Sequence, residues 1–333
     1  MKLPNASLTG LLAINLFCAS YSQAAEKVAP VTPQALLDQL RALPGTDANG
    51  RVQHNKGVIL TGTFEPTIQA ALMSRARHFH FPSQVIARFS NATGLPDIAD
   101  NSPNASPHGV ALRFTMPDDG RYTDIVMHGY NGFPVRTGEE FAEFLRVLAA
   151  PGSGKSSPLE RFLGKHPAAK RFINAPRPIW DSYASETFYG VNTFVLRNDK
   201  DKPSPGRYIL VPDAKGNQLT ESETASFSPN YLADELRERI RRTAITFDLV
   251  FQLPEKGDKL DDASISWPDT RKRLVLGTVY LTAAMPDSAT QEKQLALNPL
   301  NLADGVDISN DPLLRVRGST YALGASARGV AGK

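Results

Sequence analysis

The stretch Asp311-Pro-Leu-Leu-Arg-Val-Arg317-Gly-Ser-Thr-Tyr321 decides how the rest of the chain is interpreted. Its tyrosine lies four residues after Arg317 and seven residues before Arg328. A free tyrosine has a pKa of about 10, so a phenolate that binds a metal at neutral pH needs a ferric ion and a nearby positive charge. If the stretch is helical, Arg317 lies one turn before Tyr321 on the same face. The pattern therefore predicts that Tyr321 is an iron ligand.

Together with the residues before it, this stretch resembles the proximal haem segment of the haem catalases. Residues 298–321 match that segment without a gap, from Asn298-Pro-Leu-Asn301 through Asp311 to Tyr321. Tyrosine is an uncommon haem ligand, and catalase is an example of its use. The resemblance implies that Tyr321 binds the iron of haem b and that Arg317 modulates the phenolate.

Two motifs near the start of the chain are similar to the distal half of the same haem site. Arg51-Val-Gln-His54 resembles the motif in which the histidine lies over the iron and the arginine meets a haem propionate. Arg88-Phe-Ser90 resembles a second motif, whose arginine contacts a propionate and whose serine hydrogen-bonds the distal imidazole. Splitting hydrogen peroxide needs a neutral imidazole that takes a proton and returns it. A hydroxyl partner such as Ser90 would orient that ring.

The resemblance implies two further contacts with the cofactor. Arg328 would join Arg51 and Arg88 in offsetting two propionates through bidentate pairs. The segment from Phe133 to Phe141 resembles one in which the position of Phe141 holds a phenylalanine that stacks on the haem. The interpretation that Phe141 is an ordinary aromatic residue of a helix core is nearly as good.

The chain departs from the family at the distal asparagine that helps to position peroxide. Counting back five residues from Phe133 reaches His128, and Asn131 stands three residues after His128. We predict Asn131 as the catalytic amide and leave His128 open as the residue in its place. The chain is also much shorter than the larger catalases, which predicts a more open site that organic reductants can approach.

Apolar, β-branched runs bounded by turn residues predict a single barrel-like sheet. The runs cover 57–64, 84–90, 108–116, 122–128, 190–197, 206–212, 244–253 and 273–283. Helical periodicity predicts helices over 32–43, 138–149 and 231–240. The fold class is α+β, and the resemblance implies an antiparallel eight-stranded β-barrel with surrounding helices and no flavodoxin-like domain.

Composition and the first residues indicate an exported globular chain. Of the 333 residues 41% are hydrophobic and 21% are charged, with a formal net charge of +3 and no dense Lys/Arg block. Nothing in this balance points to nucleic acid or to a membrane surface. Residues 1–24 are typical of a cleavable secretory signal, and its removal takes away Cys18, the only cysteine. We expect residues 25–333 to form one haem-binding domain in the periplasm, without a membrane anchor.

These features together predict a small catalase-related peroxidase. It would reduce hydrogen peroxide or organic hydroperoxides with a small organic reductant, and weak catalase activity would accompany this reaction. Two alternatives stay open, a lipid-hydroperoxide isomerase or lyase on the same fold and a non-enzymatic periplasmic haem carrier. An oriented distal base argues against the carrier, since storage does not need one. The sequence identifies neither the physiological reductant nor whether the chain forms a homo-oligomer.

Overall fold

The computed structural model describes residues 30–330, except 48, 117, 153, 155, 156 and 287, and it leaves out the side chains of 288 and 289. The predicted signal, residues 1–24, and Cys18 lie outside the described residues.

Eight antiparallel strands close into a barrel, which confirms the predicted fold class. The ring closes because β10 pairs with β8 as well as with β11. In ring order the strands are β10 (Ile245–Gln252), β11 (Arg273–Ala284), β1 (Gly57–Pro66), β2 (Ser83–Ser90), β3 (Gly109–Thr115), β4 (Tyr122–His128), β6 (Phe188–Tyr189) and β8 (Pro203–Pro212).

One predicted strand lies elsewhere. The run 190–197 is a strand only as β7 (Phe194–Arg197), which sits outside the ring between β8 and β12 (Val306–Ile308). The eighth place in the ring belongs to β6, which has two residues. So short a strand cannot show an alternating pattern, which explains why the predicted runs did not include it. A separate two-stranded sheet joins β5 (Ile179–Trp180) to β9 (Gln218–Leu219).

Alternate residues of the barrel strands point inward and form the main core. On β1 the side chains of Val58, Leu60 and Phe64 are almost completely buried. The ring of Phe64 packs edge-on against Phe114 of β3, with ring centroids 5.1 Å apart. Burying an aliphatic or aromatic side chain of this size contributes about 1.5–3 kcal/mol, so the alternation largely determines which face of each strand turns inward.

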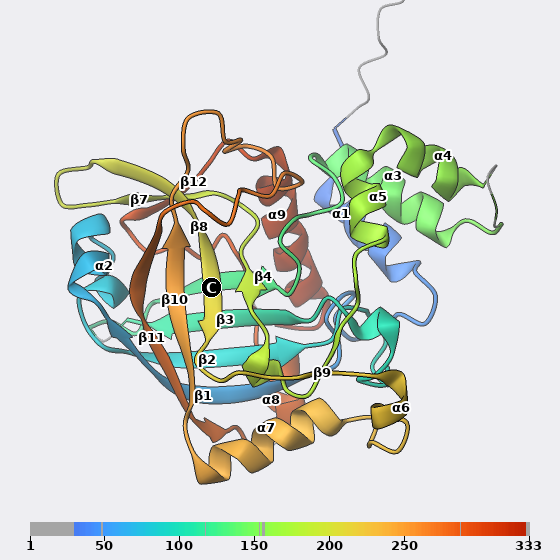
Figure 1. Cartoon of the computed structure of the whole chain (residues 1–333). Coiled ribbons are helices and arrows are strands. Elements are labelled where there is room, and N and C mark those ends of the chain that lie inside the picture. Colours follow the sequence, from blue (N-terminus) through green and yellow to red (C-terminus); the bar gives the residue numbers. More distant parts are fainter. Residues whose placement is uncertain are drawn as a thin grey trace, which may run out of the picture.

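Helices surround the barrel unevenly (Figure 1). They are α1 (Pro33–Arg41), α2 (Ile68–Met73), α3 (Gly138–Ala149), α4 (Pro158–Lys165), α5 (Pro167–Ile173), α6 (Glu221–Thr224), α7 (Tyr231–Arg242), α8 (Ser288–Gln294) and α9 (Pro312–Ala327), with 3₁₀ turns η1 (Arg77–Phe79), η2 (Pro103–Ala105) and η3 (Tyr183–Ser185). The group α1, α3, α4 and α5 lies beside α9, whereas α7 packs on β11. No helix in the described part of the chain is long and apolar enough to cross a membrane.

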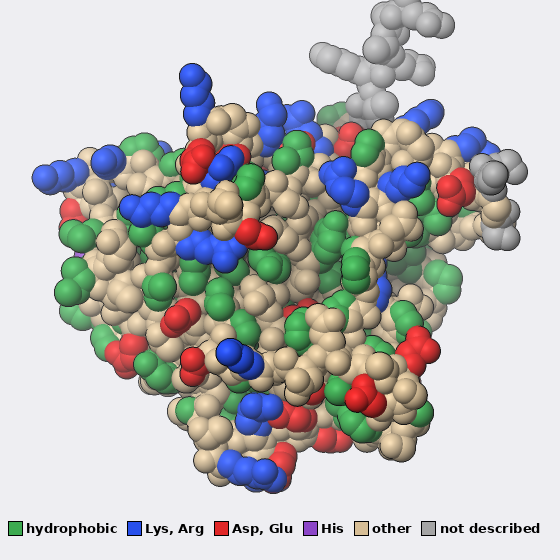
Figure 2. Space-filling view, in the orientation of Figure 1, with side chains coloured by type: hydrophobic (Ala, Val, Ile, Leu, Met, Phe, Trp, Pro, Cys, Tyr) green, Lys and Arg blue, Asp and Glu red, His purple; other side chains and the backbone are tan. Residues whose placement is uncertain are grey.

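The three helices that the sequence predicts are present, and two of them begin at clear caps. Thr32 caps α1 and is followed by proline at the first helical position. A capping box joins Thr137 and Glu140 at the start of α3, which has the predicted bounds 138–149. On the face that Figure 2 shows, Lys and Arg side chains are mixed with Asp and Glu, and hydrophobic side chains are scattered between them.

Four strand ends meet in one row at the rim of the barrel. Because neighbouring strands are antiparallel, β1 and β3 begin where β2 and β4 end. Gly57 pairs with Ser90, Ser90 with Gly109, and Gly109 with His128. Residues before Gly57 and after Ser90 are thereby brought to the same rim as His128.

A buried carboxylate ties this barrel to α9. Asp124 of β4 accepts two hydrogen bonds from Arg113, each 2.8 Å long. It also accepts from the Asn298 backbone N–H at 2.9 Å and from the Asn301 side chain at 2.7 Å. The side chain of Asn298 then donates to the Gly318 carbonyl within α9, at 3.0 Å. The Asn-Pro-x-Asn motif therefore works as a clamp between β4 and the helix that carries Tyr321.

Replacing Asp124 with alanine should lower the free energy of unfolding by about 3–5 kcal/mol, because Arg113, whose side chain is only 11% exposed, would be left without its charged partner. Urea denaturation followed by circular dichroism measures the change. The control is Asp234→Asn, which breaks an exposed pair with Arg237 on α7 and should have a far smaller effect. Equal losses in the two variants would contradict the role of the clamp.

Candidate active site

His54 lies on the loop that enters β1, in a backbone conformation that residues other than glycine rarely adopt. Its φ is 55°, in the left-handed region. The backbone N–H groups of His54 and Asn55 donate to the carbonyls of Ala92 and Thr93, at 3.1 and 2.9 Å. These bonds hold the loop against the chain that leaves β2. The ring packs over Gly109, where a Cβ would come within 2.7 Å of His54 Nδ1.

The hydrogen bonds of this ring determine which nitrogen carries the proton. His54 Nδ1 lies 2.9 Å from the Asn91 carbonyl oxygen and 3.2 Å from the Ser90 hydroxyl. A carbonyl accepts and cannot donate, so Nδ1 carries the proton of the neutral ring and Nε2 keeps its lone pair. The structure thus brings together His54 and the predicted Ser90. The Asn91 carbonyl was missed, because a backbone acceptor has no residue-type signal.

The imidazole of His54 is neutral at physiological pH. Burial lowers its pKa from 6.5 to about 4, and the charge of Arg88 adds to this, while the bond to the Asn91 carbonyl opposes it. The charges of Arg317 and His108 lower the pKa further. A neutral ring with a free Nε2 is the form that can act as a general base.

His128 carries the second imidazole of the candidate site. It ends β4 directly opposite Gly109, over which the His54 ring packs. Burial lowers its pKa to about 3, followed by the charges of Arg317 and His54. Its Nδ1 accepts the Tyr130 N–H at 3.4 Å, and its Nε2 is buried without a hydrogen-bond partner.

Asn131 lies in the loop after β4, where its carbonyl accepts a hydrogen bond from Ser266. No hydrogen bond of the described structure joins its side chain to His54. His128, the other residue that the sequence left open for the distal amide, lies opposite the Gly109 over which the His54 ring packs. The catalytic role of Asn131 stays a prediction.

Three predicted arginines gather near Tyr321. Arg51 donates to the Glu292 and Leu295 carbonyls at 2.8 and 2.6 Å, and Arg88 donates to the Glu292 carboxylate at 2.7 Å. Burial and then the charges of Arg88 and Arg328 lower the pKa of Arg51, whereas the charges of Glu292 and Tyr321 raise it.

Arg328 completes this cationic cluster, which we define as Arg51, Arg88 and Arg328. Burial and then the charge of Arg88 lower the pKa of Arg328. Its Nη1 donates to the Gly324 carbonyl at 2.9 Å, and its Nε is buried without a partner.

The cationic cluster fits a ligand with two carboxylates. In the described part of the chain, the carboxylate that this cluster contacts is Glu292 of α8. Three guanidinium groups against one carboxylate leave an excess of two positive charges, and the unpartnered Nε of Arg328 can donate one more hydrogen bond. Two propionates would supply that charge and those acceptors. Glu292 had no signal in the sequence.

Tyr321 lies in α9, so the predicted helix places Arg317 one turn before it. The guanidinium of Arg317 donates to the Asn192 side chain at 2.8 Å and lies 5.1 Å from the centre of the Phe133 ring. Phe133 in turn packs on Phe141, with ring centroids 5.1 Å apart. Phe141 is therefore part of an aromatic wall next to Arg317. Among the described residues, no three His, Cys, Asp or Glu side chains cluster as metal ligands.

A buried hydrogen-bonded pair that the sequence did not predict lies near His54 and His128. His108 Nδ1 is 2.7 Å from Glu186 Oε2, and both side chains are buried. The glycine after His128 is required there, since a Cβ on Gly129 would overlap Glu186. The partners are far apart in the sequence, so no local pattern could have indicated the pair.

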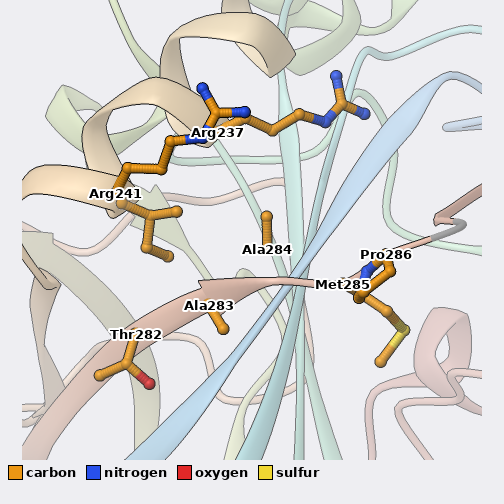
Figure 3. A pocket seen from close by; sticks show the side chains of 8 residues that line it. Arg237, Arg241, Thr282, Ala283, Ala284, Met285 and Pro286 are labelled. Atoms are coloured by element: carbon orange, nitrogen blue, oxygen red, sulfur yellow. The ribbon is translucent and has the colours of Figure 1, made fainter.

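Two surface hollows are present in the described structure. One is lined by residues of α7 and by the end of β11 with the residues after it (Figure 3). Its Arg237 and Arg241 already pair with Asp234 and Glu238 on the same helix. The other is lined by Tyr130 and by residues 167–176. Neither hollow is lined by His54 or Tyr321.

Comparison with known proteins identifies the family of this chain. A profile of the family described as Catalase matches residues 21–330. The chain belongs to the catalase family. This is a family that generally binds haem, and the cationic cluster of this chain suits that group.

Two similar members of the family are each named catalase-related peroxidase. The protein of Synechococcus elongatus is 32% identical over 305 residues, which cover 90% of this chain and 89% of that protein. The protein of Mycolicibacterium paratuberculosis is 29% identical over 302 residues, which cover 90% and 95%. The crystal structure of a fungal catalase superposes with a TM-score of 0.74 at 20% identity, over 84% of this chain and 59% of that one. The last comparison concerns the fold alone.

The lowered pKa of His54 predicts a pH dependence of stability. Because the pKa is about 4 in the folded chain and 6.5 for an ordinary histidine, the unfolded chain binds more protons between these values. Stability must then fall as the pH drops from 6.5 towards 4. Asparagine tolerates the left-handed backbone. We therefore expect His54→Asn to reduce the loss of folding stability between pH 7 and pH 5 by about 1–2 kcal/mol. Urea unfolding of the haem-free protein at both pH values measures it, and equal losses in variant and wild type would contradict it.

Proposed function

We propose that this catalase-family chain is a haem-dependent peroxidase. It reduces hydrogen peroxide or an organic hydroperoxide with electrons from a small organic donor, and dismutation of peroxide is a weaker side reaction. The observation that carries the proposal is the neutral His54 ring, whose Nδ1 is held by the Asn91 carbonyl and whose Nε2 is free to take a proton.

The residues of the site divide into those that hold haem b and those that act on peroxide. Tyr321 is the proposed iron ligand, and the cationic cluster is the proposed partner of the two propionates. Phe141 and Arg317 complete the cofactor side. When bound, haem b supplies the redox chemistry that cleaves the O–O bond and passes the oxidising equivalents to the donor.

His54 moves one proton in the reaction. Its Nε2 takes the proton from one oxygen of the peroxide and returns it to the other oxygen, which leaves as water. The ring must be neutral to begin this cycle, and burial together with Arg88 keeps it so down to about pH 4. The bond from Nδ1 to Asn91 stays in place during the transfer and keeps Nε2 aimed at the substrate.

The proposal includes export to the periplasm. It rests on residues 1–24 of the sequence, and the amino-terminal sequence of the protein recovered from a periplasmic extract tests it. Product analysis separates the peroxidase from a lipid-hydroperoxide isomerase or lyase, since only the peroxidase consumes a reductant.

Haem uptake and peroxide turnover test the function directly. We expect His54→Asn to keep the haem spectrum and to lower the rate constant for reaction with peroxide about 10²–10⁴-fold. Tyr321→Phe should change or abolish the haem spectrum, because the phenolate is lost. The measurements are the visible spectrum after one equivalent of hydrogen peroxide and the oxidation of a phenol.

His166→Gln is the control, since this ring packs on Phe162 at the junction of α4 and α5. It should behave as wild type. Unchanged peroxide turnover in His54→Asn would argue against the proposed base, and a wild-type protein that takes up no haem would refute the function.

A further inference from the structure

The two neutral imidazoles of the candidate site, those of His54 and His128, have opposite hydrogen-bonding roles. His54 donates from Nδ1 to the Asn91 carbonyl, which leaves its Nε2 as an acceptor. His128 accepts at Nδ1 from the Tyr130 backbone N–H, which places the proton of its neutral ring on Nε2. One ring therefore presents a lone pair and the other an N–H group.

The rings of His54 and His128 lie close together. The His54 ring packs so closely over Gly109 that a methyl group there would touch Nδ1 at 2.7 Å. His128 is the cross-strand partner of Gly109, and directly opposed Cα atoms in antiparallel strands are about 4.5–5.5 Å apart. His54 is accordingly close enough to disfavour a positive charge on His128.

The N–H of His128 has no acceptor in the described structure. Its Nε2 is buried and unpartnered. The charged neighbour, Arg317, carries donors alone, and the aromatic neighbour, Phe133, has no hydrogen-bonding atom at its ring, whose centre is 6.4 Å away. Native proteins seldom keep a buried donor unsatisfied, because no hydrogen bond within the protein then replaces the one to water. The missing acceptor is consistent with a place for a bound molecule.

We propose that His128 is a second catalytic residue, which donates a hydrogen bond from Nε2 to the peroxide that His54 deprotonates. The inference rests on the proposed function. Hydrogen peroxide has O–H groups and oxygen lone pairs, so one molecule can donate to His54 Nε2 and accept from His128 Nε2. No proton leaves His128, whose part is to hold the peroxide and to favour negative charge on the oxygen that it contacts.

The tautomers can be tested without haem. The ¹⁵N chemical shifts of histidine side chains in the haem-free protein distinguish a ring protonated at Nδ1 from one protonated at Nε2. We expect His54 in the first form and His128 in the second at pH 7, with the signals assigned from the His54→Asn and His128→Asn variants. A His128 ring protonated at Nδ1 would overturn the proposal, because the donor would be absent.

Fluoride binding to the haem-loaded protein tests the donor itself, since fluoride accepts hydrogen bonds and undergoes no turnover. We expect His128→Phe, which keeps the ring and removes the N–H, to weaken fluoride binding about tenfold. His128→Asn restores an N–H donor and should bind fluoride within about threefold of wild type. The rate constant for peroxide should follow the same order.

The remaining variants decide between a donor and a structural residue. The haem-free His128→Phe protein should be no less stable to urea than wild type, because it buries no unsatisfied donor. A variant that loses stability and fluoride affinity together, in both His128→Phe and His128→Asn, would show a structural role and overturn the proposal. Asn131→Ala tests the competing residue, and a loss of fluoride affinity there, with His128→Phe unchanged, would transfer the role to Asn131.

The outcomes separate this inference from the function on which it rests. If the wild-type protein takes up no haem, the peroxidase and the role of His128 both fail. If it takes up haem and reacts with peroxide, but His128→Phe binds fluoride as wild type does, the role of His128 alone fails.

Discussion

The buried carboxylate of Asp124 is the contact on which the candidate site depends. Its partners come from β3 and from the segment that leads into α9, and it lies four residues before His128 on β4. A buried carboxylate is costly unless all its partners are in place, so the clamp is either complete or strongly unfavourable. It therefore sets the position of α9 relative to the strand end that carries His128, and hence of the proximal side relative to the distal side.

Positive charge organises the site in two ways. After burial, the charges of Arg88 and Arg317 lower the pKa of His54, and the charge of Arg317 lowers that of His128. The same Arg88 belongs to the cationic cluster, which has more positive charge than Glu292 neutralises. Arg88 thus helps to keep His54 neutral and also belongs to a cluster that can bind an anionic ligand. The two effects are linked, because an anion bound at the cluster would also weaken the repulsion on His54.

Much of the fold was predictable because the barrel strands are long and alternate, and because the helices over 138–149 and 231–242 carry clear caps or periodicity. Several elements were not, and β6 and α8 show why. The two-residue strand β6 is too short to have a pattern, so the ring was predicted to include 190–197. The helix α8, with Glu292, has no apolar stripe of its own and is placed by its contact with Arg88.

By itself the sequence determined which residue types form the site and which family they resemble, because Tyr321, His54 and the arginines stand in motifs of fixed spacing. Only the tertiary structure decided the hydrogen-bond partners of the two imidazoles and the place of His128 opposite Gly109. The first depend on a backbone carbonyl at Asn91 and a backbone N–H at Tyr130, groups that nearly every residue carries. The second depends on strand register, since a shift of one residue between β3 and β4 would place a different side chain opposite Gly109.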